Sequence, residues 1–276
     1  MLPKELLKSI KHDHVHGATE LALIAIDGVR AIVQQTKNED LIHFEQSVRS
    51  LIVDLQNCRP SMAALNNLLQ KILTAVSDSA ASNVDIFKST IVNSCEDVTR
   101  FAQNAQSLAV QNMVSLIAAD DVIMTHSISS TVKKVCACLQ ESQPTVRLIV
   151  TESRPGDEGK LLAAFLSELG LHTTYITEAQ IDLHMPEVSK VVVGADAVLA
   201  DGSIINKCGT NLMALSARYH SVPFYVCAES FKQKSDNEYE LEQMSGDELK
   251  LELASVKLSN IYFERLPSEL ITRWVR

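Results

Sequence analysis

The spacing of apolar residues changes once along this chain, near residue 120, and this change restricts the possible folds more than any other feature. From residue 16 to about 117 apolar residues recur with the 3.6-residue period of an α-helix, as in LALIAIDGVRAIV and IHFEQSVRSLIVDL. Breaks at 37–40, at 59–60 and around 78–82 divide this part into about four helices. We therefore expect an N-terminal helical bundle.

From Asp121 onward, short β-branched runs alternate with helical ones. The expected strands cover 121–126, 146–152, 172–176, 190–195 and 222–228, and the expected helices lie near 129–140, 159–169, 178–184 and 209–219. Strands that alternate with helices predict a mostly parallel sheet with right-handed crossovers. The sequence thus predicts an α/β protein, with a helical N-terminal domain (residues 1–117) followed by a Rossmann-like domain (residues 118–276).

The composition excludes several classes of partner. The chain has 276 residues, a formal net charge of −9 and no cluster of Lys and Arg, so nucleic acid is a poor partner. No run approaches the ~18 apolar residues of a membrane helix, and the N-terminus lacks the apolar core of a signal peptide. Six cysteines without framework spacing indicate reduced thiols. We expect a cytoplasmic protein that binds neither nucleic acid nor a membrane.

The stretch VVVGADAVLADGSIINKCGT, residues 191–210, has a pattern typical of a ligand site. A β-branched run ends at Gly194, so Asp196 lies just past the carboxyl end of a buried strand, where open α/β sheets bind ligands. Asn206 and Lys207 follow a second apolar pair and lead into a predicted helix. A lysine near a helix N-terminus suits a phosphate group.

Polar side chains also follow three other predicted strands. Ser127, Ser129 and Ser130 follow the first strand, Arg154 follows the second, and Lys232 follows the last. Each group alone is more readily explained as a helix cap or a solvated loop. Because the strand exits meet at one sheet edge, together they predict a site for an anionic small molecule, and their basic members favour a phosphorylated one.

Cofactor and metal motifs are missing from the sequence. No G-x-G-x-x-G or Walker pattern follows a predicted strand, so we expect no cofactor. His12, His14 and His16 alternate, but no acidic or Cys partner at ligand spacing completes a set, so we expect no metal. The acidic segment 233–257 is expected to be a solvated loop with one short helix.

Four segments, DDVIMTHSISSTV, IVTESRP, KVVVGADAVLADGSIINKCGT and PFYVCAESFK, resemble a known superfamily in order and spacing. This superfamily joins the α, β and δ subunits of translation initiation factor 2B with isomerases of methylthioribose 1-phosphate and of ribose 1,5-bisphosphate. The resemblance implies a homodimer or an assembly with related subunits. In the family the segment resembling NIYFERLPSELIT continues into a further strand and helix that help to form the twofold dimer, whereas this sequence stops at Arg276.

The resemblance assigns catalytic positions. In the isomerases a cysteine follows the Thr-His of the first strand, and it shares the proton transfer between C1 and C2 of the opened sugar with the Asp of the GAD motif. Here these positions are Ser127 and Asp196. A serine hydroxyl is far less acidic than a thiol, and His126 points to the opposite side of an extended strand. Ser127 is therefore not expected to replace the cysteine.

Most positions that hold the substrate in the family are retained. The Arg-Gly-Ala of the isomerases corresponds to the segment that begins at His16, so a titratable histidine replaces the arginine. The Arg-Pro that contacts phosphate corresponds to Arg59 and Pro60. The substrate-binding positions implied by the resemblance and by the strand exits are His16, Gly17, Ala18, Thr19, Arg59, Arg154, Asn206, Lys207 and Lys232.

Two functions follow from these residues. The first is binding of a phosphorylated sugar or a similar phosphometabolite by a protein related to the initiation factor 2B α, β and δ subunits. Such a protein would act either as a translation-initiation regulatory subunit or as a stand-alone protein. We favour it because the anion-binding groups are kept while Ser127 replaces the cysteine. The alternative is an aldose–ketose isomerase of ribose 1,5-bisphosphate or a related sugar 1-phosphate, in which Asp196 and another group share the proton transfer.

Overall fold

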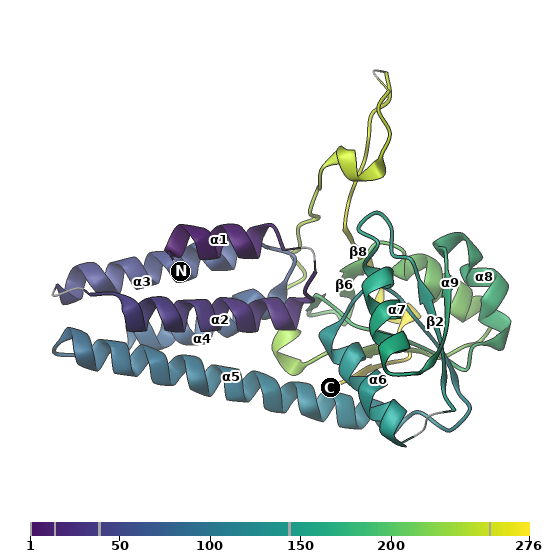
Figure 1. Ribbon diagram of the computed structural model, residues 1–276, viewed down its shortest axis with the longest axis horizontal. Coiled ribbons are helices and arrows are strands. Elements are labelled where there is room, and N and C mark those ends of the chain that lie inside the picture. Colours follow the sequence, from purple (N-terminus) through teal and green to yellow (C-terminus); the bar gives the residue numbers. More distant parts are fainter. Residues whose placement is uncertain (1, 14, 38–39, 143–144, 254) are drawn as a thin grey trace.

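The computed structural model describes residues 2–13, 15–37, 40–142, 145–253 and 255–276. A helical bundle forms one end of the molecule and an α/β layer structure forms the other (Figure 1). The expected fold class, a helical N-terminal part followed by a Rossmann-like part, is confirmed. Among the described residues, no helix is long and apolar enough to cross a lipid bilayer.

The bundle contains the four expected helices and one that was not predicted. The helices are α1 (Pro3–Lys11), α2 (Ala18–Gln35), α3 (Leu41–Asn57), α4 (Ala63–Ser77) and α5 (Val84–Val114). The side chains of Asp40 and Asn83 accept hydrogen bonds from first-turn amides of α3 and α5, which explains where these helices begin. Helix α1 buries only Leu6 and Ile10, too few apolar positions to reveal a period.

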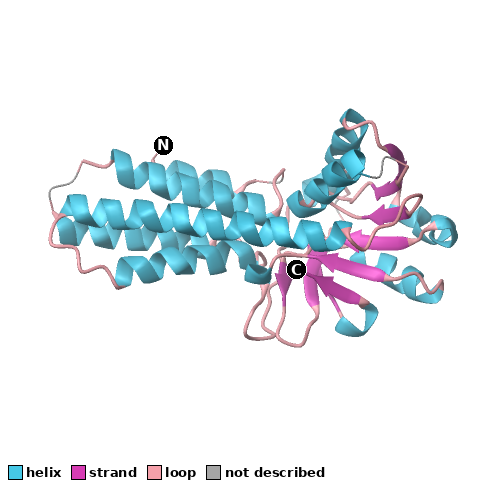
Figure 2. Ribbon diagram, turned by 90° about the horizontal axis from the view of Figure 1, so that it is seen from below, coloured by secondary structure: helices cyan, strands magenta, loops and turns pink. Residues whose placement is uncertain are grey.

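The main sheet has six parallel strands in the order β3-β2-β1-β4-β7-β9 (Figure 2). Its strands are β1 (Val122–Thr125), β2 (Arg147–Thr151), β3 (His172–Ile176), β4 (Lys190–Val193), β7 (Phe224–Cys227) and β9 (Arg273–Val275). The five expected strands are confirmed, and β9 is an addition. The order reverses between β1 and β4, and this switch point is where ligands bind in such sheets.

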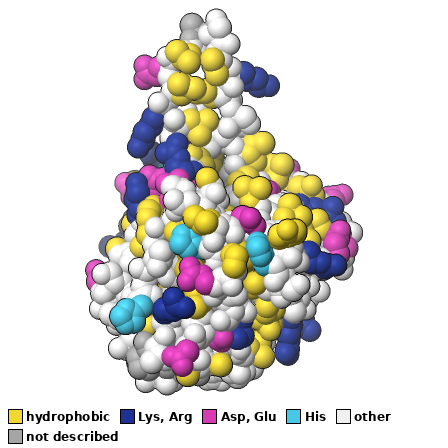
Figure 3. Space-filling view, turned by 90° about the vertical axis from the view of Figure 1, so that its right-hand side faces the viewer, with side chains coloured by type: hydrophobic (Ala, Val, Ile, Leu, Met, Phe, Trp, Pro, Cys, Tyr) yellow, Lys and Arg dark blue, Asp and Glu magenta, His cyan; other side chains and the backbone are white. Residues whose placement is uncertain are grey.

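Helices cover both faces of this sheet. Apolar residues of α6 (Ser130–Ser142), α7 (Glu158–Glu168) and the last turns of α5 pack on one face. Helices α8 (Ile181–His184) and α9 (Thr210–Tyr219) pack on the other. Figure 3 shows the end of the molecule that carries α8 and α9, where apolar and charged side chains are mixed on the surface. Helix α5 thus joins the bundle to the sheet.

A second, antiparallel sheet was not predicted. It contains β5 (Ala197–Val198), β6 (Ile204–Lys207) and β8 (Phe263–Leu266). Residues from β5, β6 and the start of β8 belong to the apolar core of the bundle, so this sheet wedges between the two ends of the molecule. The chain between Lys232 and β8 projects from the body, and its described residues include a short 3-10 helix, Gly246–Leu249, as expected for the acidic segment (Figure 1).

Candidate functional site

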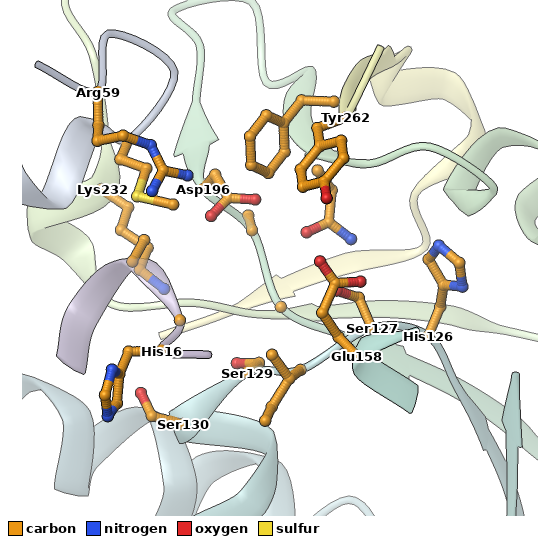
Figure 4. A pocket seen from close by; sticks show the side chains of 18 of the residues that line it. His16, Arg59, His126, Ser127, Ser129, Ser130, Glu158, Asp196, Lys232 and Tyr262 are labelled. Carbon is orange, nitrogen blue, oxygen red and sulfur yellow. The ribbon is translucent and has the colours of Figure 1, made fainter. Parts of the chain in front are cut away.

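A polar cavity lies where the bundle meets both sheets, at the carboxyl ends of β1 and β4 (Figure 4). Its volume is about 50 Å³, and the empty space around it, counted out to the open solvent, is about 620 Å³. The predicted residues that line it are His16, Gly17, Ala18, Arg59, Ser127, Ser129, Ser130, Asp196, Asn206 and Lys232. The cavity is also lined by Asp13, Met62, His126, Ile128, Glu158, Gly194, Ala195, Tyr262 and Phe263.

The exit of β1 places Ser127 on one wall. Its backbone is left-handed, with φ 64°, and its amide donates a hydrogen bond to Ser153 Oγ over 2.7 Å. Both ring nitrogens of His126 are engaged elsewhere, Nδ1 with Thr151 Oγ1 (2.6 Å) and Nε2 with the Cys208 carbonyl (2.8 Å). Burial lowers the pKa of His126. His126 therefore has no free nitrogen with which to deprotonate Ser127.

Two helix N-termini meet at the cavity. Helix α2 begins directly after Gly17, and α6 begins at Ser130. A Cβ on Gly17 would lie 3.4 Å from the Ile128 carbonyl and from the Ser130 amide, so the glycine permits the close approach of the two starts. First-turn amides have no partner within their own helix, and the helix dipole makes them favourable for anions. This wall is suited to a phosphate.

Asp196 lies opposite, at the exit of β4. Its backbone amide donates to the Ile205 carbonyl over 2.8 Å, and its carbonyl accepts from the Ala63 amide over 3.0 Å, which fixes the loop between both sheets and the bundle. Burial raises the pKa of Asp196 to about 6, although Lys232 opposes the shift. This carboxyl group can therefore carry or release a proton near neutral pH.

Arg59 is held on two sides. Its Nε lies 3.1 Å from Glu242 Oε2, and its Nη1 donates to the Asp13 carbonyl over 2.9 Å. Ser61 Oγ also donates to Glu242. The guanidinium is 5% exposed and is fixed at the cavity by the projecting acidic segment.

Two further cations are paired in the same way. Lys232 Nζ lies 3.0 Å from Glu229 Oε2, and Lys207 Nζ lies 2.7 Å from Glu158 Oε1. Lys207 also sits 3.5 Å from the centre of the Tyr262 ring, so Glu158 and Tyr262 separate it from the cavity. Each of these three cations is thus paired with a carboxylate whose side chain is at most 10% exposed.

Three of the predicted residues do not line the cavity. They are Lys207, described above, Thr19 and Arg154. Thr19 is buried and donates from Oγ1 to Glu229 Oε1 over 3.0 Å. The Arg154 side chain is 40% exposed and lies 4.0 Å from Asp157, outside the cavity. The backbone turns at Ser153, with φ 61°, before Arg154.

Glu158 and Tyr262 were missed by sequence reasoning. Glu158 is the first residue of α7, the helix that follows the second strand exit. Its place after a strand exit could have identified it as a candidate site residue. Tyr262 precedes β8 and reaches the cavity only because the second sheet forms. His12 caps the end of α1 and His16 Nδ1 lies 2.7 Å from Asp13 Oδ2, while His14 lies outside the described residues.

Comparison with known proteins places these features in a family. A model of the initiation factor 2 subunit family matches residues 14–275. An eIF-2B subunit 2-like protein of Pyrococcus horikoshii is 32% identical over 274 residues, which cover 97% of this chain and 92% of the relative. A ribose 1,5-bisphosphate isomerase of Pyrococcus furiosus is 27% identical over 272 residues, which cover 98% of this chain and 80% of the relative.

Solved structures share the whole fold. The crystal structure of translation initiation factor eIF-2B from Pyrococcus horikoshii superposes with a TM-score of 0.85 at 29% identity, covering 99% of this chain and 94% of that one. A chain of the tetrameric eIF2B-β2δ2 complex from C. thermophilum has a TM-score of 0.70 at 18% identity, covering 99% and 88%. At 18% identity the second likeness concerns the fold alone.

Proposed function

The chain belongs to the initiation factor 2 subunit family, and from this membership and the cavity geometry we propose that the protein binds a phosphorylated sugar. The observation that carries the proposal is the meeting of two helix N-termini, at Ala18 and Ser130, on one wall of a polar cavity. The phosphate accepts hydrogen bonds from their first-turn amides. Arg59 and Lys232 add positive charge that their carboxylate partners partly offset.

The other walls suit the hydroxyl groups of a sugar. Asp196, Asn206 and Ser127 also line the cavity and supply acceptors and donors for hydroxyls. Asn206 is 6% exposed, and its Nδ2 donates to Thr210 Oγ1 over 3.0 Å, which leaves its carbonyl oxygen for a ligand. A sugar phosphate carries both kinds of group: its phosphate suits the helix N-termini, and its hydroxyls suit the polar side chains.

Binding without isomerisation is the version we propose. In the isomerases that the sequence resembles a thiol takes part in proton transfer, and Ser127 stands at that position here. His126 does not activate it, because both its nitrogens have other partners. A binding protein of this kind acts as a regulatory subunit in translation initiation or as a stand-alone metabolite-binding protein.

Titration calorimetry with ribose 1,5-bisphosphate and methylthioribose 1-phosphate tests the proposal. Ala18→Pro removes one first-turn amide at a position where proline is compatible with a helix, and Gly17 before it is already extended. We expect the affinity to fall about tenfold, because a hydrogen bond to a charged group contributes about 1.5–3 kcal/mol. Val84→Pro makes the same change at the start of α5, far from the cavity, and should leave affinity unchanged. Absence of binding by the unmodified protein would refute the proposal.

An isomerase is the second candidate, favoured by the raised pKa of Asp196 and by the similarity to ribose 1,5-bisphosphate isomerases. A buried carboxyl group with a pKa of about 6 suits transfer of a proton between neighbouring carbons. This candidate requires ketose formation that Asp196→Asn abolishes. Turnover that survives Asp196→Asn would exclude Asp196 as the proton carrier.

We also propose that the chain forms a homodimer or assembles with related subunits, as its resemblance to initiation factor subunits suggests. Light scattering coupled to size-exclusion chromatography measures the mass. A mass of one chain at all protein concentrations would contradict the homodimer.

A further inference from the structure

The cavity contains more acid than its proposed phosphate ligand requires. Five carboxylates line it or directly pair with its cations, namely Asp13, Glu158, Asp196, Glu229 and Glu242. Among the described residues, the basic side chains that accompany them are Arg59, Lys207 and Lys232. Even when His16, paired with Asp13, is counted as protonated, the acids remain in excess. A dianionic phosphate alone would increase this imbalance.

Glu158 is the carboxylate whose geometry indicates a missing partner. Glu158 is 7% exposed, and its Oε1 accepts a hydrogen bond from Lys207 Nζ over 2.7 Å. Oε2 is buried and has no hydrogen-bond partner among the described residues. In Figure 4 this carboxylate points into the space that Asp196 also faces. Buried polar atoms are nearly always hydrogen-bonded, so Oε2 marks the position of a donor that the protein does not supply.

A metal ion does not explain this arrangement. Among the described residues, no three His, Cys, Asp or Glu side chains are grouped closely enough to hold one. A neutral hydroxyl would satisfy Oε2 but would leave the charge imbalance unchanged. An ammonium group donates hydrogen bonds to Oε2 and also offsets one of the two negative charges that the phosphate brings.

On the basis of the proposed sugar phosphate function, we propose that the ligand is an amino sugar phosphate, whose ammonium group is bound by Glu158 and Asp196. The phosphate lies against the N-termini of α2 and α6, and the ammonium group lies at the opposite side of the cavity. Glu158 then determines specificity for the amine. Lys207 is a positioning residue, since its ammonium fixes Oε1 and thereby the direction of Oε2.

Calorimetric titration with two matched pairs tests this proposal. The pairs are glucosamine 6-phosphate with glucose 6-phosphate, and glucosamine 1-phosphate with glucose 1-phosphate; ribose 1,5-bisphosphate serves as the reference for the proposed function. We expect the amine to bind at least about tenfold more tightly than its hydroxyl counterpart in one pair, as befits one added charge-assisted hydrogen bond. Glu158→Gln should reduce this preference to about twofold or less. The matched control is Glu187→Gln, at a half-exposed carboxylate, which should retain the preference.

The double variant Glu158→Gln/Lys207→Met guards against a folding defect. Glu158→Gln leaves the ammonium of Lys207 buried without a carboxylate, whereas the double variant removes both charges. It should fold and should also lack the preference. Equal affinity for amine and hydroxyl, or binding of ribose 1,5-bisphosphate but of neither amino sugar phosphate, would overturn the inference and leave the proposed function intact. Failure of every sugar phosphate to bind would instead refute the proposed function.

Discussion

At the scale of single residues, the basic side chains of the site are paired with carboxylates, whereas Asp196 is a carboxyl group whose pKa is raised by burial. Burial opposes its ionisation more than Lys232 supports it. A carboxyl group whose pKa is raised in the folded protein favours the protonated form. Its contribution to stability is therefore complete at low pH and is lost as the pH rises through about 6.

The variant Asp196→Asn should reveal how much the ionised Asp196 carboxylate destabilises the folded protein. At pH 4 the two proteins should have similar free energies of unfolding, because both side chains are then largely neutral. Above pH 7 the variant should be more stable by on the order of 2 kcal/mol, since the ionised carboxylate is penalised only in the unmodified protein. Urea denaturation between pH 4 and pH 8 measures the difference. A difference that is independent of pH would contradict the raised pKa.

At the scale of elements, Glu229 connects the N-termini of α2 and α6, the wall of the cavity that we propose binds phosphate. This residue is fully buried at the exit of β7. Oε1 accepts hydrogen bonds from Thr19 of α2 (3.0 Å) and Thr131 of α6 (2.5 Å), and Oε2 pairs with Lys232. One carboxylate thus holds both helix N-termini and a lysine in register.

Glu229→Ala should destabilise the protein by about 3–5 kcal/mol, because it leaves Lys232 buried without a partner and removes the acceptor of two hydroxyls. Glu229→Gln/Lys232→Met retains an acceptor and removes the unpaired charge. We expect it to recover at least half of the loss in urea denaturation. A single variant that costs less than about 1 kcal/mol would show that this network does not hold the wall together.

The elements also show how far the sequence could predict the fold. Helices α2–α5 and strands β1–β4 and β7 have clear periods, and they were predicted. Strands β6 and β8 pair although Lys207 and Phe263 are far apart in the chain, so no local pattern marks the second sheet. The three residues of β9 are too few to show a period.

The same limits apply to the site. The strand exits locate Ser127, Asp196 and Asn206 because parallel strands bring their carboxyl ends to one edge. The direction of Arg154 depends on a backbone turn at Ser153, and the placement of Tyr262 depends on the unpredicted sheet. The sequence pattern therefore predicts which edge of the sheet carries the site. It does not predict the direction of single side chains or the pairing of strands that are far apart in the chain.

At the scale of the whole molecule, the cavity lies where the helical bundle meets both sheets. Helix α2 contributes one N-terminus, the exits of β1 and β4 contribute Ser127 and Asp196, and Glu242 of the projecting segment pairs with Arg59. A ligand in this cavity would contact the bundle and both sheets, and it should stabilise the protein by roughly 2.7 kcal/mol at 100 times its dissociation constant. We propose that this scaffold binds a phosphorylated sugar without isomerisation, because Ser127 stands where the isomerases that the sequence resembles have a cysteine.

Nuclear magnetic resonance of ribose 1,5-bisphosphate mixed with the protein in deuterated water tests this account most directly, because one sample reports both binding and chemistry. We predict that the phosphorus resonances shift and saturate with added protein while the sugar stays an aldose, without deuterium at C2. Formation of the ketose, or incorporation of deuterium at C2, would contradict binding without isomerisation, and unshifted phosphorus resonances would contradict binding itself.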